Sequence, residues 1–79
     1  MIRVLFFGPV AERVGVREMA LDYENGMALH DVMHSIGMQR PGALSIVSFI
    51  AVNQRQVHDR KLLLSDNDEI AFMAKYSGG

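Results

Sequence analysis

A single amphipathic helix lies between two groups of short β-rich runs, and this order most strongly constrains the fold. The apolar stripe of the helix falls at positions i, i+3, i+4 and i+7 within residues 27–36: Leu29, Val32, Met33 and Ile36. Four runs flank the helix in two pairs and are predicted strands: residues 2–7, 17–23, 49–53 and 69–74. A short helical turn over residues 11–14, a short strand around Val57 and a helix end at Gly37 complete the prediction.

This order predicts an α+β fold with a mixed sheet and one main helix packed on one face. The first two strands are too close in sequence for a long crossover, so we expect them to pair antiparallel. The helix then crosses over the sheet, and this arrangement is the β-grasp, or ubiquitin-like, layout. In that layout the first and last strands lie side by side at the centre of the sheet. Its predicted core is Val4, Phe6, Met19, Leu21, Leu29, Val32, Met33, Ile36, Ile50, Val52, Leu64, Ile70 and Phe72.

Length and composition restrict the chain to a few classes of protein. With 79 residues, we expect a single domain over residues 1–79 with a flexible C-terminal tail over residues 75–79. Eight Lys and Arg against nine Asp and Glu give a net charge of −1, which disfavours nucleic acid as a partner. The longest apolar run, residues 44–52, is too short to span a membrane, and no signal peptide is recognisable. We therefore expect a cytoplasmic protein.

The sequence contains no recognised motif for internal catalysis. It has no cysteine, which excludes disulfides, Cys-ligated metals and thiol nucleophiles, and it has no phosphate-binding loop or catalytic serine elbow. His30 and His34 are spaced i, i+4 on the helix, a spacing that can hold a metal. They flank the apolar stripe on its solvent side without an evident third ligand, so we interpret them as solvated and expect no metal site.

Leu5, Phe7 and Met73 are predicted to form an apolar patch on the side of the sheet away from the helix. They alternate with core residues on the first and last strands, which the predicted layout places side by side. Scattered surface apolar residues are common, but a contiguous patch on so small a domain favours a partner-binding site.

Gly78 and Gly79 form the carboxyl end of the sequence. A terminal carboxylate becomes reactive when it is adenylated, because AMP is a good leaving group. Two residues without a Cβ let such a carboxylate thread a narrow channel. A frayed end or a cloning remnant are the alternatives. The absence of other chemistry in the chain favours a functional end.

Several segments, in this order, resemble the ubiquitin-like sulfur carriers, and most closely the molybdopterin synthase small-subunit branch (MoaD). They cover nearly the whole chain: residues 2–8, 12–15, 29–36, 51–54, 64–72 and 77–79. No single segment is specific, but the ordered set is. The related thiazole-pathway carriers usually lack a helical segment corresponding to residues 11–15, so its expected presence favours the molybdopterin branch.

The resemblance implies a carrier that is not catalytic alone and binds no cofactor. A partner similar to ubiquitin-activating enzymes uses ATP to adenylate Gly79, and a sulfur donor converts it to a thiocarboxylate. The tail then enters the large subunit of molybdopterin synthase, in an expected heterotetramer, and donates sulfur to a cyclic pyranopterin precursor. By this analogy Gly78 allows threading, and the partner contacts are Leu5, Phe7, Met73, Lys75, Tyr76 and Ser77.

The chain departs from the family just before the tail, where two prolines are common. Ala74 and Lys75 stand at that place and are followed by Tyr76, which adds a cation at the entrance to a partner's channel. A carrier for thiazole synthesis or tRNA thiolation is therefore an alternative. So is a β-grasp interaction module without terminal chemistry.

Overall fold

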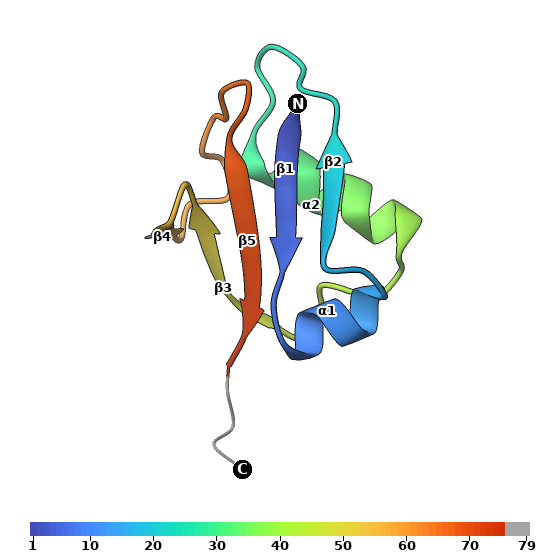
Figure 1. Cartoon of the computed structure of the whole chain (residues 1–79). Helices are drawn as coiled ribbons and strands as arrows, with labels where there is room; N and C mark the ends of the chain where they lie inside the picture. The colour runs from blue at the N-terminus through green and yellow to red at the C-terminus, as the bar shows by residue number, and fades with distance from the viewer. Residues whose placement is uncertain (76–79) are drawn as a thin grey trace.

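The computed structural model describes residues 1–75 of the chain, and the predicted tail beyond Lys75 lies outside them. Figure 1 shows a sheet with the longer helix across one face and the shorter helix at the end of the sheet near the close of β5. The elements follow the predicted order: β1 Ile2–Phe6, α1 Pro9–Val14, β2 Glu18–Leu21, α2 Leu29–Gln39, β3 Val47–Val52, β4 Arg55–Val57 and β5 Glu69–Ala74.

The five strands form one mixed sheet in the order β2-β1-β5-β3-β4. The two ends of the described chain meet at its centre, because β1 and β5 are parallel neighbours with Phe6 opposite Phe72. The pairs β1–β2, β3–β5 and β3–β4 are antiparallel. This arrangement confirms the predicted β-grasp fold, with the helical crossover joining the two antiparallel pairs.

The core lies between the sheet and α2. Alternate residues of the central strands point toward the helix, and Phe6 and Phe72 stack there with ring centroids 6.0 Å apart. The predicted stripe of α2 is buried at Leu29, Val32 and Ile36. Three other predicted core residues, Met19, Leu21 and Met33, are only partly buried, because β2 is an edge strand and Met33 lies at the margin of the stripe. Four buried members of the core were not predicted: Ile2, Val10, Val14 and Ala43.

The predicted end of α2 at Gly37 is wrong. The helix continues to Gln39, and the Arg40 N–H donates to the Ile36 carbonyl over 2.7 Å. Pro41 explains the stop better, because a residue before proline is disfavoured in the helical region, and Arg40 has φ −134° and ψ 76°. At the other end, the Asp31 carboxylate accepts a hydrogen bond from the Ala28 N–H at 2.8 Å and satisfies one free helical donor.

The stretch that the sequence leaves unassigned, residues 38–48, contains the end of α2, turns over residues 41–46 and the start of β3. That strand starts at Val47, two residues earlier than predicted, and its pairing with β5 is irregular between Val47 and Phe49. None of the helices among residues 1–75 has the length and apolarity needed to cross a membrane.

Candidate partner-binding site

The face of the sheet opposite α2 carries a continuous set of apolar side chains. Phe49 pairs with Met73, and the Phe7 N–H donates to the Phe72 carbonyl over 3.1 Å, which places Phe7 beside Met73. A second row crosses the same face where Leu5 pairs with Ala71. We call this surface the outer apolar face, and its members are Leu5, Phe7, Phe49, Ala51, Ala71 and Met73.

The structure brings together the three residues that the sequence predicted for this patch. Phe7 is 49% exposed, while Leu5 and Met73 are half-buried by their neighbours. Phe49, which is 40% exposed, completes the row and was not predicted. Its position next to the buried Ile50 in a β-rich run was the available signal, because successive strand residues point to opposite faces. The prediction placed only the first and last strands side by side, so it did not bring Phe49 next to Met73.

A paired arginine bounds the outer apolar face on one side. The Arg3 guanidinium bridges two strands, with Nε 3.2 Å from Glu18 Oε2 and Nη1 3.2 Å from Glu69 Oε2. The hydrogen bond to Glu18 is the main cause that raises the pKa of Arg3 above its usual value. The charge of Arg3 is thus already paired with two carboxylates at the margin of the face. The centre of the face contains only apolar side chains.

A hollow adjoins one corner of the outer apolar face, between the ends of β1 and β2 and helix α1. Its volume is about 490 Å³, and we call it the corner hollow. Gly8 forms part of its wall with φ +53°, and a Cβ built there would meet no atom within 4 Å. Its lining includes Leu5, Phe7, Gly8, Ala11, Glu12 and Arg17.

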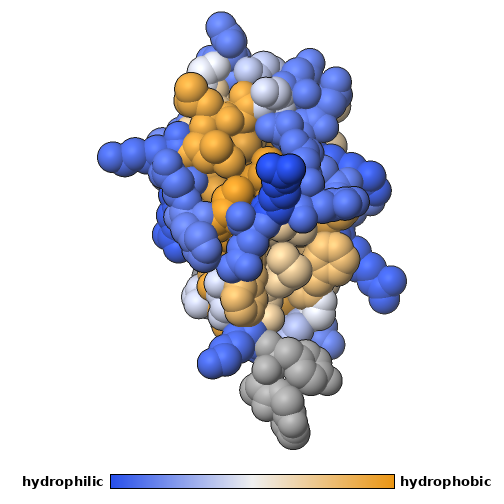
Figure 2. All heavy atoms as spheres, turned by 90° about the vertical axis from the view of Figure 1, so that its left-hand side faces the viewer, coloured by the Kyte–Doolittle hydropathy of each residue, from blue (hydrophilic) through white to orange (hydrophobic). Residues whose placement is uncertain are grey.

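Another exposed apolar residue lies away from this face. Leu63 is 69% exposed in the loop that follows β4, where its pairing with Ala28 ties it to the start of α2. Figure 2, viewed from the side of β4, shows a hydrophobic area in its upper half, bordered by hydrophilic side chains, and a paler one lower down.

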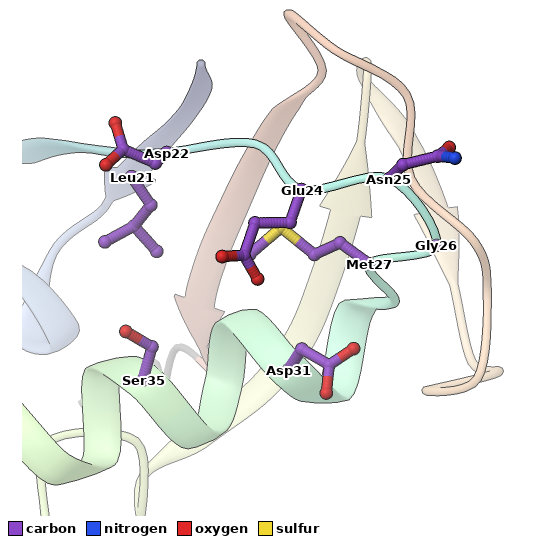
Figure 3. Close-up of a pocket in the computed structure, with 8 residues that line it drawn as sticks. All are labelled: Leu21, Asp22, Glu24, Asn25, Gly26, Met27, Asp31 and Ser35. Carbon is purple, nitrogen blue, oxygen red and sulfur yellow. The ribbon is translucent and has the colours of Figure 1, made fainter.

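A second hollow is polar. It measures about 520 Å³ and lies between α2 and the loop that follows β2. In Figure 3, Asp22 and Glu24 belong to that loop, while Asp31 and Ser35 project from the helix. Within the part of the chain that the structure describes, no group of three or more His, Asp or Glu side chains is placed to hold a metal ion.

The two helical histidines are exposed, as expected. His30 Nδ1 lies 3.4 Å from Asp31 Oδ1, its neighbour in sequence. His34 lies on the same exposed side of α2.

The predicted chemical end of the chain is only partly within the described residues. Lys75 is exposed and directly follows β5, where Ala74 pairs with Val47. The chain therefore leaves the sheet from its central strand, two residues after Met73 of the outer apolar face. The remaining predicted site residues, Tyr76, Ser77, Gly78 and Gly79, lie outside the described residues.

Comparison with known proteins gives both a sequence relationship and a fold relationship. Residues 4–79 match the ThiS family. The molybdopterin synthase sulfur carrier subunit of Chlamydomonas reinhardtii is 32% identical over 81 residues, covering 99% of this chain and 98% of that protein.

Solved structures show the same fold at lower identity. SAMP1 from Haloferax volcanii superposes with a TM-score of 0.85 at 19% identity, covering 99% of this chain and 98% of that one. A chain from the complex of subunits 1 and 2 of molybdopterin-converting factor from Helicobacter pylori 26695 gives a TM-score of 0.70 at 23% identity, covering 99% and 97%. From the match over residues 4–79 and the full-length relative, the chain belongs to the ThiS family of β-grasp sulfur carriers.

Proposed function

We propose that this chain is the sulfur-carrying small subunit of molybdopterin synthase and that Gly79 carries the sulfur. The observation that carries the proposal is the 32% identity to a molybdopterin synthase sulfur carrier subunit over almost the whole of both chains. The family match that extends to residue 79 supports it, because it includes both glycines of the proposed reactive end.

The proposed chemistry takes place at the Gly79 carboxylate. An activating enzyme joins this carboxylate to AMP from ATP and releases pyrophosphate. A sulfide-level donor then attacks the carbonyl carbon, and AMP leaves with the electron pair of the broken C–O bond. The product is a thiocarboxylate. Its sulfur attacks a carbon of a cyclic pyranopterin precursor and displaces an oxygen leaving group. Water then cleaves the acyl–sulfur bond, which leaves the sulfur on the precursor and restores the Gly79 carboxylate.

The chain contributes binding and presentation to this reaction, and its partners contribute the catalysis. The outer apolar face supplies the docking surface, since Phe7 and Phe49 expose aromatic area that a partner's apolar surface can cover. The large synthase subunit is the proposed partner there, and the Helicobacter pylori chain of the same fold comes from a complex of subunits 1 and 2 of molybdopterin-converting factor. Lys75, Tyr76 and Ser77 lead from β5 to Gly78, which lets the end thread into the partner's site.

Removal of Gly79 is the first test. The chain lacking Gly79, and a chain extended beyond it, should form no thiocarboxylate with the activating enzyme, ATP and a sulfur donor. Both should keep the free energy of unfolding of the original chain, because the described core lies between Ile2 and Phe72. Intact-mass spectrometry reads the replacement of one carboxyl oxygen by sulfur, and urea unfolding reads the stability. Thiocarboxylate formation or full transfer activity in the permanently extended chain would exclude this role for Gly79.

A carrier for another sulfur pathway is the second candidate, favoured by Ala74 and Lys75 where molybdopterin carriers commonly have two prolines. The same reconstitution separates the two candidates. A thiocarboxylated chain that the large subunit binds and desulfurates in the presence of the pyranopterin precursor supports the molybdopterin role. A thiocarboxylate that persists under those conditions supports a different acceptor.

A further inference from the structure

We propose that the corner hollow receives one apolar side chain of the large synthase subunit and that this contact fixes how the two proteins align. The inference rests on the proposed function, because it assigns a second feature to the same docking surface. The occupant is a single large aliphatic or aromatic side chain that projects from the partner.

Continuity with the outer apolar face is the first argument. Leu5 and Phe7 belong to that face and also line the corner hollow. Phe7 is 49% exposed, so one side chain forms the boundary between the flat surface and the depression. A partner that covers Phe7 therefore also closes the mouth of the hollow. A flat apolar surface does little to fix the position of a partner. A partner side chain that enters a depression fixes that position well.

The local backbone keeps the hollow open before any partner binds. Gly8 has φ +53°, a conformation that strains residues with a Cβ, and it leaves open space where a side chain would stand. The opposite wall is α1, which is fixed to the core through Val10 and Val14 at 0% and 2% exposure. Its last turn is closed by a hydrogen bond of 2.8 Å from the Gly15 N–H to the Ala11 carbonyl. The partner thus does not have to order this surface on binding.

The exposure and polarity of the hollow fit a protein contact. A volume of about 490 Å³ leaves room for a whole aromatic or aliphatic side chain, the type of residue that dominates binding energy in interface pockets. Small-ligand sites bury most of the ligand and orient it with a few convergent polar groups. Here the charged Glu12, Arg17 and Glu18 lie on the exposed rim, and Glu18 is already paired with Arg3. A polar rim around an apolar centre is typical of a protein interface.

Three substitutions on α1 test the proposal in the full chain. Glu12 is exposed and lines the hollow, so Glu12→Phe fills it from the rim without entering the core. Glu12→Ala removes the same charge but leaves the hollow open. Arg13→Phe places an aromatic ring at the next exposed position of α1, outside the hollow lining. Binding of each variant to the purified large subunit is measured by calorimetry, and the fold of each is checked by circular dichroism and thermal unfolding.

We expect Glu12→Phe to weaken binding by about tenfold or more, as for the loss of a buried anchor. Glu12→Ala and Arg13→Phe should bind within about threefold of the original chain, because the first leaves the hollow open and the second lies outside it. Unchanged binding of a folded Glu12→Phe overturns the proposal. Equal weakening by Glu12→Ala also overturns it, because the effect then comes from the charge. A Glu12→Phe chain that binds the large subunit normally but binds the activating enzyme weakly overturns it too, because the hollow then serves another partner. If the original chain itself does not bind the large subunit, the proposed function fails instead.

Discussion

Phe72 and Phe49 show how one residue's parity in a strand decides its role. Ile50 pairs with Phe72 and Phe49 pairs with Met73, so the two phenylalanines point to opposite faces of the same strand pair. Phe72 is fully buried and stacks on Phe6, whereas Phe49 is 40% exposed. The same side chain thus stabilises the fold at one position and offers binding surface at the other.

Replacing each of these phenylalanines by alanine should separate the two roles. Phe72→Ala should lower the free energy of unfolding by about 3–5 kcal/mol, because it leaves a cavity in a small core. Phe49→Ala, which removes the same atoms from an exposed site, should lower it by less than about 1 kcal/mol. Urea unfolding monitored by circular dichroism measures both. Equal losses of stability would show that the assignment of the two faces is wrong.

Strand alternation made most of the core predictable at the level of residues, since Val4, Phe6, Ile70 and Phe72 are buried as the sequence indicated. Three of the four missed core residues, Val10, Val14 and Ala43, lie outside the strands and the main helix, whereas Ile2 lies at the start of β1. Val10 and Ala43 are buried by tertiary packing of short segments, where too few residues exist to establish a period. The docking role of Leu5, Phe7 and Met73 remains a prediction, because their proximity is shown but no partner is present.

At the level of elements, the predicted end of α2 was the clearest error. Two residues could have ended this helix, Gly37 and Pro41. Glycine ends helices when it adopts a left-handed conformation, but Gly37 is not among the glycines with positive φ. Gly15, by contrast, follows α1 with φ 94° and does end that helix. Glycine alone therefore did not identify the boundary, and the proline at position 41 set it.

Alanine substitutions at the two glycines should change stability in opposite directions. Gly37→Ala should raise the free energy of unfolding by up to about 1 kcal/mol, because alanine favours a helix interior and the new Cβ meets no atom within 4 Å. Gly15→Ala should lower it by about 1 kcal/mol, because the left-handed conformation strains a residue with a Cβ. Thermal and urea unfolding measure whether each substitution raises or lowers the free energy of unfolding. A destabilised Gly37→Ala would restore Gly37 as the end of the helix.

At the level of the whole molecule, the two faces of the β-grasp sheet have different roles. One face is covered by α2 and forms the core, and the other keeps the outer apolar face available beside the strand that leads to the tail. The layout was predictable, because strand spacing and one helical crossover leave few topologies. The corner hollow was not, because it arises where α1, β1 and β2 meet and depends on backbone angles at Gly8.

This division predicts that a charge on the outer apolar face impairs binding without unfolding the protein. Phe7 is 49% exposed, so Phe7→Asp leaves its carboxylate in water in the isolated chain and should keep the fold. In the complex with the large subunit, the same carboxylate is buried without a partner. The loss of a central aromatic contact is worth about 2 kcal/mol or more, and desolvation of the charge adds to it. Calorimetry should therefore show binding weakened by about 30-fold or more.

Leu63→Asp is the matched control, since Leu63 is 69% exposed and lies outside the outer apolar face. It introduces the same charge on another surface and should leave binding within about threefold of the original chain, because surface substitutions away from an interface have small effects. If both variants weaken binding equally, the added negative charge acts at long range, and raising the salt concentration should then restore both. If Leu63→Asp alone weakens binding, the large subunit docks near the loop that follows β4 at the start of α2, and the outer apolar face serves another partner. If only Phe7→Asp weakens binding, and a higher salt concentration does not restore it, the large subunit contacts the outer apolar face.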